Sequence, residues 1–594
     1  MIERKKEMGR DRVSRLVSWG HWFAFFNGFL AMIIGVRYIE TVGAPESWLG
    51  WGYLTISTLG HFSFLAFIVY LVVLFPISLI LPYSKILRGL AAVAATFSLC
   101  ILLYDTIIYD DYGLHLSPFV FDIAWADLNS LLQGTSYIVT PLGIIILELT
   151  AANFLWKRIE KIRKSNYGNK VVIFIGICFV SSHLIHIWAD AADVTEITRL
   201  DDAYPLSYPA TARSFMERHG IEKGEMDHND TRTQPTLNYP ISPLQCSAND
   251  KVNLLLVTVD GFRTDMVDEM TMPFLYQYAR NNHQFSQHHS GGTIHESGLF
   301  SLLYGLQGSY IAASDLNYRS PVLTQELKQQ GYALGLFAPK MESVVPNAIY
   351  QDLEDHTQSV NESIADADIR SIETFKTWQA EQAQPWFALI NLQSPDSYDT
   401  PIGFLGIETV KPKQTLKPAQ KVLFNQYRQS LNFIDKQLQQ LLTQVPEETF
   451  VLITGVSGKV FTSDNNEART NMSPMNVNVP LIINWPGPAN AKKVNYPTSH
   501  YDIVPTLMTQ LLNCNNKAKD YSSGQSLLQP NSNSWTYVGD NLVFGIYQED
   551  EITVIDRHGK YRIYDKDYSK RLRKKISAPE FIQVMREGRR FYNH

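Results

Sequence analysis

One acidic side chain, Asp260, stands where a metal ion or a phosphoryl group would be bound. It follows Val252–Val259, a nearly continuous run of β-branched and aliphatic residues that ends at Asp260-Gly261. Such a run is typical of a strand buried on both faces of a parallel sheet. Ligands gather at the carboxyl ends of such strands. We therefore predict that Asp260 lies at the ligand-binding edge of a central strand.

The elements that must position Asp260 alternate along the chain. Short apolar runs predict strands at Tyr332–Phe337, Trp386–Leu392, Thr449–Gly455 and Val479–Trp485. Helical periodicity predicts helices at Ser320–Gln330, Asp366–Gln379 and Lys417–Gln444. This alternation favours a mostly parallel sheet covered on both faces. Runs around turn residues predict a small antiparallel sheet at the carboxyl end, formed by Leu542–Tyr547, Ile552–Asp556 and Lys560–Tyr564.

Four motifs, in this order, resemble the sulfatase and alkaline-phosphatase superfamily, which includes phosphoethanolamine and phosphoglycerol transferases. They are Val-Thr-Val-Asp260-Gly, a Gly-Gly-Thr293 turn before Gly298-Leu299-Phe300, Val479–Gly487, and Ser499–Leu507. The resemblance covers about residues 250–530 and implies an α/β alkaline-phosphatase-like (sulfatase-like) domain. It also implies phosphoryl or sulfuryl transfer through a covalent intermediate, assisted by one or two divalent metals.

Two neighbouring residues, Thr293 and Ile294, could occupy the position of the nucleophile that this chemistry requires. Thr293 offers a hydroxyl, but an alignment anchored on Gly298 puts Ile294 at the nucleophile position, and isoleucine can neither attack phosphorus nor bind metal. His295 and Glu296 could be metal ligands, although such a pair in a loop is more typical of a surface.

The metal ligands that the superfamily uses are largely missing. Where the related transferases carry an Asp-His pair, this chain has Val456-Ser457-Gly458, and where a histidine is usual it has Gln393-Ser394-Pro395. These residues cannot supply the charge that holds a divalent cation tightly. We predict a non-catalytic, degenerate hydrolase site with no cofactor, or at most a weakly held divalent metal. Its vestigial candidates are Thr293 for catalysis and Asp260 and His500 for metal binding.

The amino-terminal third predicts a five-helix transmembrane bundle. Five apolar runs are long enough to cross a bilayer: Trp22–Ile39, Thr55–Leu81, Ile86–Ile108, Tyr137–Trp156 and Val171–Ala191. Ionisable residues such as His61 and Asp105 lie mostly near the ends of the runs, where snorkelling to the interface suffices. The formal net charge of -6 gives no reason to expect bulk nucleic-acid binding.

Loop charge predicts the orientation of these spans. Lysines and arginines gather before the first run, after the second and after the fourth, whereas Val42–Tyr53 and Tyr109–Ser136 contain neither. The positive-inside rule then places the amino terminus in the cytoplasm and residues 192–594 outside. In that compartment Cys246 and Cys514 are the only pair available for a disulfide, and the sequence does not decide whether they meet.

A connector, residues 192–250, joins the predicted transmembrane domain (1–191) to the predicted sulfatase-like domain (251–594). Its segment Pro205–His219 begins extended and acquires helical spacing from Thr211, with Arg213 and Arg218 as cations. A basic amphipathic segment at the outer headgroup level suits anionic lipids. The spacing alone favours an ordinary interdomain helix over a lipid-binding segment.

The whole chain resembles the YejM/PbgA (LapC) family of Gram-negative inner-membrane proteins. The resemblance includes Ser18–Ala24 in the first span, Gly60–Leu65 in the second, and Leu206–Arg213 in the connector. It implies a periplasmic sensor of lipopolysaccharide that acts through the LapB adaptor, which guides the deacetylase LpxC to the protease FtsH. Cardiolipin binding or transport is also implied.

The resemblance further implies a lipid A site in the connector and a LapB contact at the membrane helices. The residues that map onto the lipid motif are Ser207, Tyr208, Pro209, Ala210, Thr211, Ala212, Arg213 and Phe215. Ser214 stands where a second arginine is common, which removes one cation, and Arg218 could substitute for it. The rival hypothesis is a metal-dependent phosphatase or phosphoryl-group transferase acting on lipid headgroups.

Overall fold

The computed structural model describes residues 2–42, 44–45, 47–80, 83–112, 114–117, 120–121, 136–164, 167–191, 194–207, 237–247, 251–311, 319–340, 347–359, 363–412, 416–462, 465–487, 491–530, 534–556 and 559–592. The chain divides into two compact units. One comprises Met1–Pro235 with Ala578–Ile582, and the other Thr236–Ser577 with Gln583–His594. The division falls inside the predicted connector.

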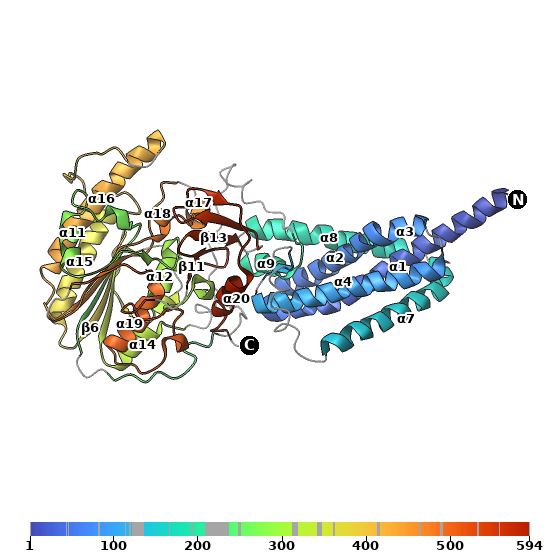
Figure 1. The fold of residues 1–594 in the computed structure, drawn as a ribbon, viewed down its shortest axis with the longest axis horizontal. Coiled ribbons are helices and arrows are strands. Elements are labelled where there is room, and N and C mark those ends of the chain that lie inside the picture. Colours follow the sequence, from blue (N-terminus) through green and yellow to red (C-terminus); the bar gives the residue numbers. More distant parts are fainter. Residues whose placement is uncertain are drawn as a thin grey trace. The chain divides into compact units, whose positions relative to one another are not determined.

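The first unit is a bundle of long apolar helices (Figure 1). Its elements are α1 (Ile2–Val42), α2 (Trp48–Val69), η1 (Tyr70–Leu74), α3 (Phe75–Ile80), α4 (Ser84–Tyr112), α7 (Ser136–Lys164), α8 (Tyr167–Ala191), α9 (Thr195–Leu200) and η2 (Asp201–Ala203). Among the described residues, five segments are long and apolar enough to cross a membrane, which confirms the predicted spans. They are Val13–Ile39, Trp48–Ile80, Ser84–Asp110, Val139–Lys164 and Tyr167–Asp190.

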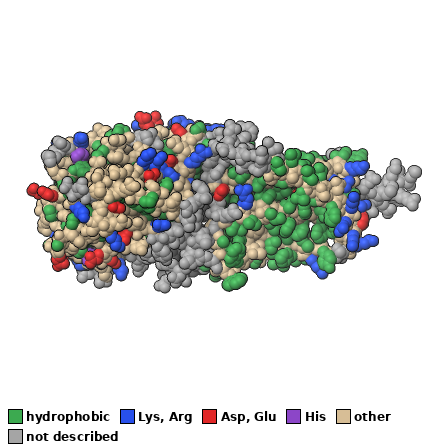
Figure 2. Space-filling model, turned by 90° about the horizontal axis from the view of Figure 1, so that it is seen from below, with side chains coloured by type: hydrophobic (Ala, Val, Ile, Leu, Met, Phe, Trp, Pro, Cys, Tyr) green, Lys and Arg blue, Asp and Glu red, His purple; other side chains and the backbone are tan. Residues whose placement is uncertain are grey.

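On the face that Figure 2 shows, the surface of this bundle is largely hydrophobic. Lysine and arginine side chains gather on it towards the amino-terminal end. The second span contains a π-helical turn, η1, immediately before Pro76. Proline lacks an N–H and its ring crowds the carbonyl four residues earlier, so a wider turn relieves the clash. The span therefore continues across Pro76 to Ile80.

Gly60 allows α2 and α8 to approach closely. A Cβ atom at this position would lie 2.7 Å from the Cα atom and 2.8 Å from the nitrogen of Phe179. These are backbone atoms, so the helices would have to separate. We expect Gly60→Ala to lower the free energy of unfolding by about 1–3 kcal/mol, measured by thermal melting of the full-length protein in detergent.

Gly52→Ala is the matched control for this substitution. Gly52 lies in the same helix, and a Cβ there would meet nothing within 4 Å. This variant should be as stable as the wild type or slightly more stable, because alanine favours helix over glycine. Equal stability of the Gly60→Ala and Gly52→Ala proteins would show that the close approach is not a constraint.

The second unit is built on an eight-stranded sheet in the order β5-β4-β6-β1-β7-β8-β2-β9. Its strands are β1 (Leu254–Val259), β2 (His283–Phe285), β4 (Ala333–Phe337), β5 (Glu354–Asp355), β6 (Trp386–Leu392), β7 (Phe450–Gly455), β8 (Leu481–Asn484) and β9 (Lys493–Val494). β1 is fully buried and pairs in parallel with β6 and β7, as expected for a central strand. β8 pairs antiparallel with β7.

Helices cover both faces of this sheet (Figure 1). Residues of β1 alternate between two apolar cores: Leu254 and Leu256 pack in one, and Leu255 and Val257 in the other. The first core includes α12 (His295–Tyr304), α14 (Val322–Gln329) and α19 (Ile503–Gln510), and the second includes α11 (Pro273–Arg280), α15 (Ile364–Glu381) and α16 (Pro418–Leu442). This is the predicted doubly covered sheet.

Smaller elements complete this unit. β3 (His288–His289) pairs with β10 (Thr498–Ser499), and η6 (His500–Asp502) leads into α19. A five-stranded antiparallel sheet is formed by β11 (Thr536–Gly539), β12 (Val543–Tyr547), β13 (Glu551–Asp556), β14 (Tyr561–Asp565) and β15 (Arg571–Leu572). The remaining elements are η3 (Thr264–Met266), η4 (Gly308–Tyr310), η5 (Asn347–Ile349), α17 (Asn465–Thr470), α18 (Pro474–Val477) and η7 (Ala518–Asp520). Helix α20 (Ala578–Glu587) is divided between the two units, and only its part from Gln583 onwards belongs to this one. The carboxyl-terminal sheet was predicted as three strands, and β11 and β15 extend it.

Candidate functional site

Asp260 occupies the predicted position at the carboxyl end of β1, but protein groups engage both of its carboxylate oxygens. Nδ1 of His295 lies 2.7 Å from Oδ2, and the side-chain amide of Asn391 donates to Oδ1 at 3.0 Å. Nδ2 of Asn391 also donates to Oγ1 of Thr258 at 2.9 Å, and the amide of Gln393 donates to Oδ1 of Asn391. The carboxylate is therefore held in a closed network of side chains.

His295 is the basic side chain that contacts Asp260. It is the first residue of α12, and its side chain is 16% exposed. Burial lowers the pKa of its imidazole, but the charge and hydrogen bond of Asp260, with Asp396 and Glu296, outweigh burial and leave the pKa raised. The interpretation of His295 as a surface loop residue is wrong, because α12 turns it inwards against Asp260.

Thr293 does not join this network. Its hydroxyl donates to the backbone oxygen of Arg469 at 2.8 Å. Ile294 is the N-cap of α12, in the place where the superfamily has its nucleophile when the alignment is anchored on Gly298. The Thr293 hydroxyl is thus committed to a structural bond.

His500 is completely buried on another side of α12. Its Nδ1 lies 3.2 Å from the carbonyl oxygen of Gly298 and 3.3 Å from Oγ of Ser301. Burial lowers its pKa to about 4, so the ring is neutral at pH 7. The structure therefore gives the two vestigial metal candidates, Asp260 and His500, different hydrogen-bond partners.

The ends of β6 and β7 are also occupied by structural contacts. Backbone N–H groups of Gln393 and Ser394 donate to the carboxylate of Asp368. Burial raises the pKa of Asp368 to about 7, against the opposing effect of these hydrogen bonds. At the end of β7, the carbonyl oxygen of Val456 lies only 2.1 Å from where a Cβ on Gly298 would be.

These residues do not fit a divalent metal. Across the part of the chain that the structure describes, His, Cys, Asp and Glu side chains nowhere gather in a group of three or more that could hold an ion. Asp260 already has a cationic partner, and Val456 and Ser457 provide no charge where the superfamily has Asp-His. We derive no catalytic step from this donor set.

The start of the connector forms a second candidate site, on α2. The Tyr204 hydroxyl lies 2.7 Å from Oγ of Ser57 and 2.9 Å from Oγ1 of Thr58. Nε2 of His61 lies 2.9 Å from the carbonyl oxygen of Pro205. Snorkelling is therefore the wrong explanation for His61, which contacts the connector instead. The signal that could have revealed this contact is the spacing of the three polar side chains on one face of α2.

Ser207 is the one predicted lipid-binding residue that the structure describes. Its hydroxyl donates to the carboxylate of Asp201 at 2.9–3.0 Å, which closes a tight turn after η2. The other predicted lipid-binding residues lie outside the described residues; they are Tyr208, Pro209, Ala210, Thr211, Ala212, Arg213, Phe215 and Arg218. The connector therefore begins pinned to the bundle through Tyr204 and His61.

Buried polar pairs within the bundle were not predicted. Asp105 accepts hydrogen bonds from the Tyr38 hydroxyl and from the backbone N–H of Leu116, and its Oδ2 lies 2.8 Å from Nδ1 of His115. Asn27 donates to Glu148 at 3.2 Å. Buried ionisable groups in a membrane require such partners. Asp105 is thus an interior group rather than one that snorkels.

Two families match consecutive parts of the chain. Residues 5–246 match a family described as a domain of unknown function (DUF3413), and residues 252–513 match the sulfatase family. A solved structure described as a protein in the alkaline phosphatase superfamily from Vibrio parahaemolyticus covers 60% of this chain and 90% of its own, at 14% identity and a TM-score of 0.46. The family matches and the apolar helices together define a membrane protein that carries a sulfatase-family domain.

Relatives that align along nearly the whole chain identify the family within this class. The inner membrane protein YejM of Salmonella typhimurium is 31% identical over 603 residues, which cover 98% of both chains. An uncharacterized protein of Haemophilus influenzae is 31% identical over 573 residues, covering 94% of this chain and 93% of its own. The chain belongs to the YejM family of inner membrane proteins.

Proposed function

We propose that this protein is a non-catalytic sensor of lipopolysaccharide that regulates lipid A synthesis. The second unit (Thr236–Ser577 with Gln583–His594), which we call the soluble unit, lies in the periplasm. The connector binds the phosphorylated lipid A headgroup at the outer face of the inner membrane. The membrane helices transmit the lipid's presence to a LapB-type adaptor, which controls proteolysis of LpxC. Cardiolipin is a second anionic lipid that the connector would accept.

The contact between the connector and α2 carries this proposal. Tyr204 and Pro205 fix the chain beside Ser57, Thr58 and His61, so the basic segment that follows starts from a defined point on the bundle. A phosphate bound by Arg213 would therefore act on a segment that is directly attached to a spanning helix. Charge-assisted hydrogen bonds to phosphate are among the strongest polar contacts.

Two further observations support the proposal. The contact of His295 with Asp260 leaves the hydrolase-like site without a place for a divalent ion, which argues against the rival phosphatase or transferase. The disulfide between Cys246 and Cys514 suits an oxidising compartment, and with the lysine and arginine distribution of the loops it supports a periplasmic location of the soluble unit.

Arg213→Glu, compared with Thr293→Ala, tests the proposal. Charge reversal beside a phosphate should weaken lipopolysaccharide binding by roughly tenfold or more, because a charge-assisted hydrogen bond contributes about 1.5–3 kcal/mol. In cells that depend on this protein, the Arg213→Glu variant should alter LpxC abundance and lipopolysaccharide content. Thr293→Ala should leave both unchanged, since its hydroxyl makes only one structural bond. Loss of function from Thr293→Ala alone would instead favour the phosphatase or transferase.

A further inference from the structure

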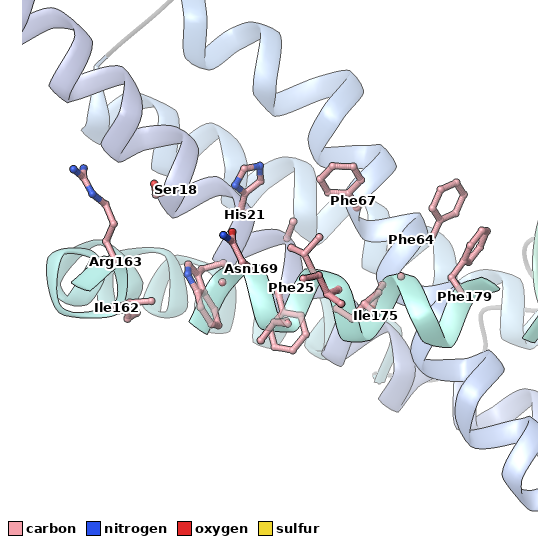
Figure 3. Close-up of a pocket in the computed structure, with 18 residues that line it drawn as sticks. Ser18, His21, Phe25, Phe64, Phe67, Ile162, Arg163, Asn169, Ile175 and Phe179 are labelled. Carbon is pink, nitrogen blue, oxygen red and sulfur yellow. The ribbon is translucent and has the colours of Figure 1, made fainter. Parts of the chain in front are cut away.

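A groove of about 680 Å³ between α1, α2 and α8 lies within the membrane spans (Figure 3). The hydrocarbon chains of a bilayer are sufficient to fill such a groove, so it indicates no specific partner. A basic surface on the five-stranded antiparallel sheet of the soluble unit is different, because no solvent-like neighbour satisfies its charge.

Basic residues gather where the chain forms the last two strands of this sheet. Residues 561–577 include seven lysines and arginines and two aspartates, which gives a net charge of +5, whereas the whole chain carries -6. Arg562, Arg571 and Arg573 are exposed and have no ion pair among the described residues. We call these three residues the basic edge.

The strand register places two of these arginines beside a tyrosine. Arg571 in β15 lies directly opposite Tyr564 in β14. Arg562 precedes Tyr564 by two residues in the same strand, so both side chains are on one face of the sheet. The ring of Tyr564 stacks on that of Tyr568, with the centroids 4.2 Å apart. Arginine and tyrosine are the residues that contribute most often to the energetic centres of protein interfaces.

The turn between β14 and β15 fixes this arrangement. The carboxylate of Asp565 accepts hydrogen bonds from the backbone N–H groups of Ser569 and Lys570 and from the Ser569 hydroxyl. Tyr568 has a φ of 57°, a left-handed conformation that is costly for a non-glycine residue and persists only where its surroundings impose it. The basic edge is therefore preorganised, which lowers the cost of ordering it on binding.

The outer edge of β15 is open. β15 is the last strand in the sheet order, and no strand among the described residues pairs with its other side. Edge strands that only avoid aggregation typically carry lysine, whereas the planar guanidinium of arginine binds a carboxylate through two parallel hydrogen bonds. Pairing with the same edge of a second copy would bring like charges together. The occupant that complements this edge is therefore an acidic strand.

We propose that the outer edge of β15 binds an extended acidic segment of another protein, which adds to the sheet as a further strand. Arg573 follows Arg571 by two residues, and alternate side chains of a strand are about 7 Å apart along one face. Carboxylates at alternate positions of the segment face these arginines, and backbone hydrogen bonds form along β15. The basic edge includes no residue of the connector or of the membrane helices, so this contact is independent of the lipid site proposed above.

Fluorescence anisotropy of the full-length protein in detergent tests this proposal, with labelled synthetic peptides as probes. The first probe is a short peptide in which glutamate alternates with valine, a residue that favours strands. The matched control peptide has proline in place of valine: it carries the same charge, but proline has no N–H to donate. Arg571→Glu and Arg573→Glu reverse charges of the basic edge, and Arg280→Glu makes the same change at an exposed position of α11.

We expect the valine peptide to bind the wild type and the Arg280→Glu protein equally well. The proline peptide should bind about tenfold more weakly or worse, because it cannot pair with a strand. Each charge reversal at the basic edge should weaken binding of the valine peptide about tenfold or more, because repulsion replaces a charge-assisted pair. Hydrogen–deuterium exchange of the backbone around Arg571 should slow when the valine peptide is bound.

Four results would overturn the proposal. Equal affinities for the two peptides would reduce the contact to bulk charge, and unchanged binding after both Arg571→Glu and Arg573→Glu would place the peptide elsewhere. Displacement of the peptide by an equal amount of phosphatidylglycerol would assign the surface to lipid. Absence of binding up to about 1 mM valine peptide would leave the edge without the proposed partner. Arg573 lies beyond the end of β15, so Arg573→Glu decides alone if the Arg571→Glu protein does not fold.

Discussion

Removal of the disulfide between Cys246 and Cys514 is expected to lower the free energy of unfolding of the soluble unit by about 4–5 kcal/mol. The two cysteines are 268 residues apart in the chain, so the bond closes a very long loop. A crosslink that closes so long a loop removes much of the conformational freedom of the unfolded chain. The double variant Cys246→Ala/Cys514→Ala should melt roughly 5–10 °C lower in differential scanning calorimetry.

The native segments around the bond are also held by hydrogen bonds. The N–H of Ser247 donates to the oxygen of Leu512 at 3.2 Å, and that of Asn515 donates to the oxygen of Gln245 at 3.0 Å. The folded state should therefore survive loss of the bond, and the main effect should act on the unfolded state. Because Cys514 packs in the apolar core, alanine is a better replacement than serine.

Cys100→Ala, which removes a free thiol of the membrane bundle, is the control for this experiment. It should leave the transition of the soluble unit unchanged. A reductant should lower the melting temperature of the wild type to that of the double variant and should not affect the variant. If thiol titration shows the bond reduced while the melting temperature stays constant, the bond does not stabilise this unit.

The central sheet could be predicted because its strands are long apolar runs. β1, β6 and β7 are completely buried, so most of their positions hold hydrophobic residues and each run stands out in the sequence. The short strands β2 and β9, at one side of the sheet, have three and two residues and no such signature. These strands pair with segments far away in the chain, and the local sequence pattern does not indicate such pairing.

The membrane spans could be predicted for the same reason, since composition over roughly 20 residues decides insertion. Their interior contacts could not. The partners Asn27 and Glu148 are 121 residues apart, and only the packing of α1 against α7 brings them together. The anchoring of Tyr204 to Ser57 likewise joins residues 147 positions apart.

The candidate hydrolase site could also be predicted from the sequence only in part. The position of Asp260 followed from one strand and one rule about parallel sheets. Its partner His295 did not, because the pairing depends on where α12 begins and which way its first turn faces. The chain has a histidine that compensates the buried carboxylate, and sequence pattern alone cannot distinguish such a histidine from a surface one.

His295→Ala is expected to destabilise the soluble unit by about 3–5 kcal/mol, because it leaves the buried carboxylate of Asp260 without its cationic partner. Among the described residues, Asn391 would then remain as the side-chain donor to this carboxylate, through one hydrogen bond. The measurement is chemical denaturation at pH 6.5. The double variant Asp260→Asn/His295→Ala completes a mutant cycle and should recover part of the loss, since no charge remains buried. A coupling free energy of about 1–3 kcal/mol would identify the pair as the source.

The pH dependence of this loss has a defined sign. The pKa of His295 in the folded protein is raised above its ordinary value of 6.5. The stabilisation from its charge is therefore fully present below about pH 6.5 and is lost as the pH rises through the folded pKa. Asp368, whose pKa is about 7, titrates in both proteins, so its effect cancels in the difference. The stability difference between the wild type and His295→Ala should consequently be larger at pH 6 than at pH 9. A difference that stays constant or grows towards alkaline pH would mean that His295 contributes packing rather than charge, and that Asp260 is stabilised by other groups.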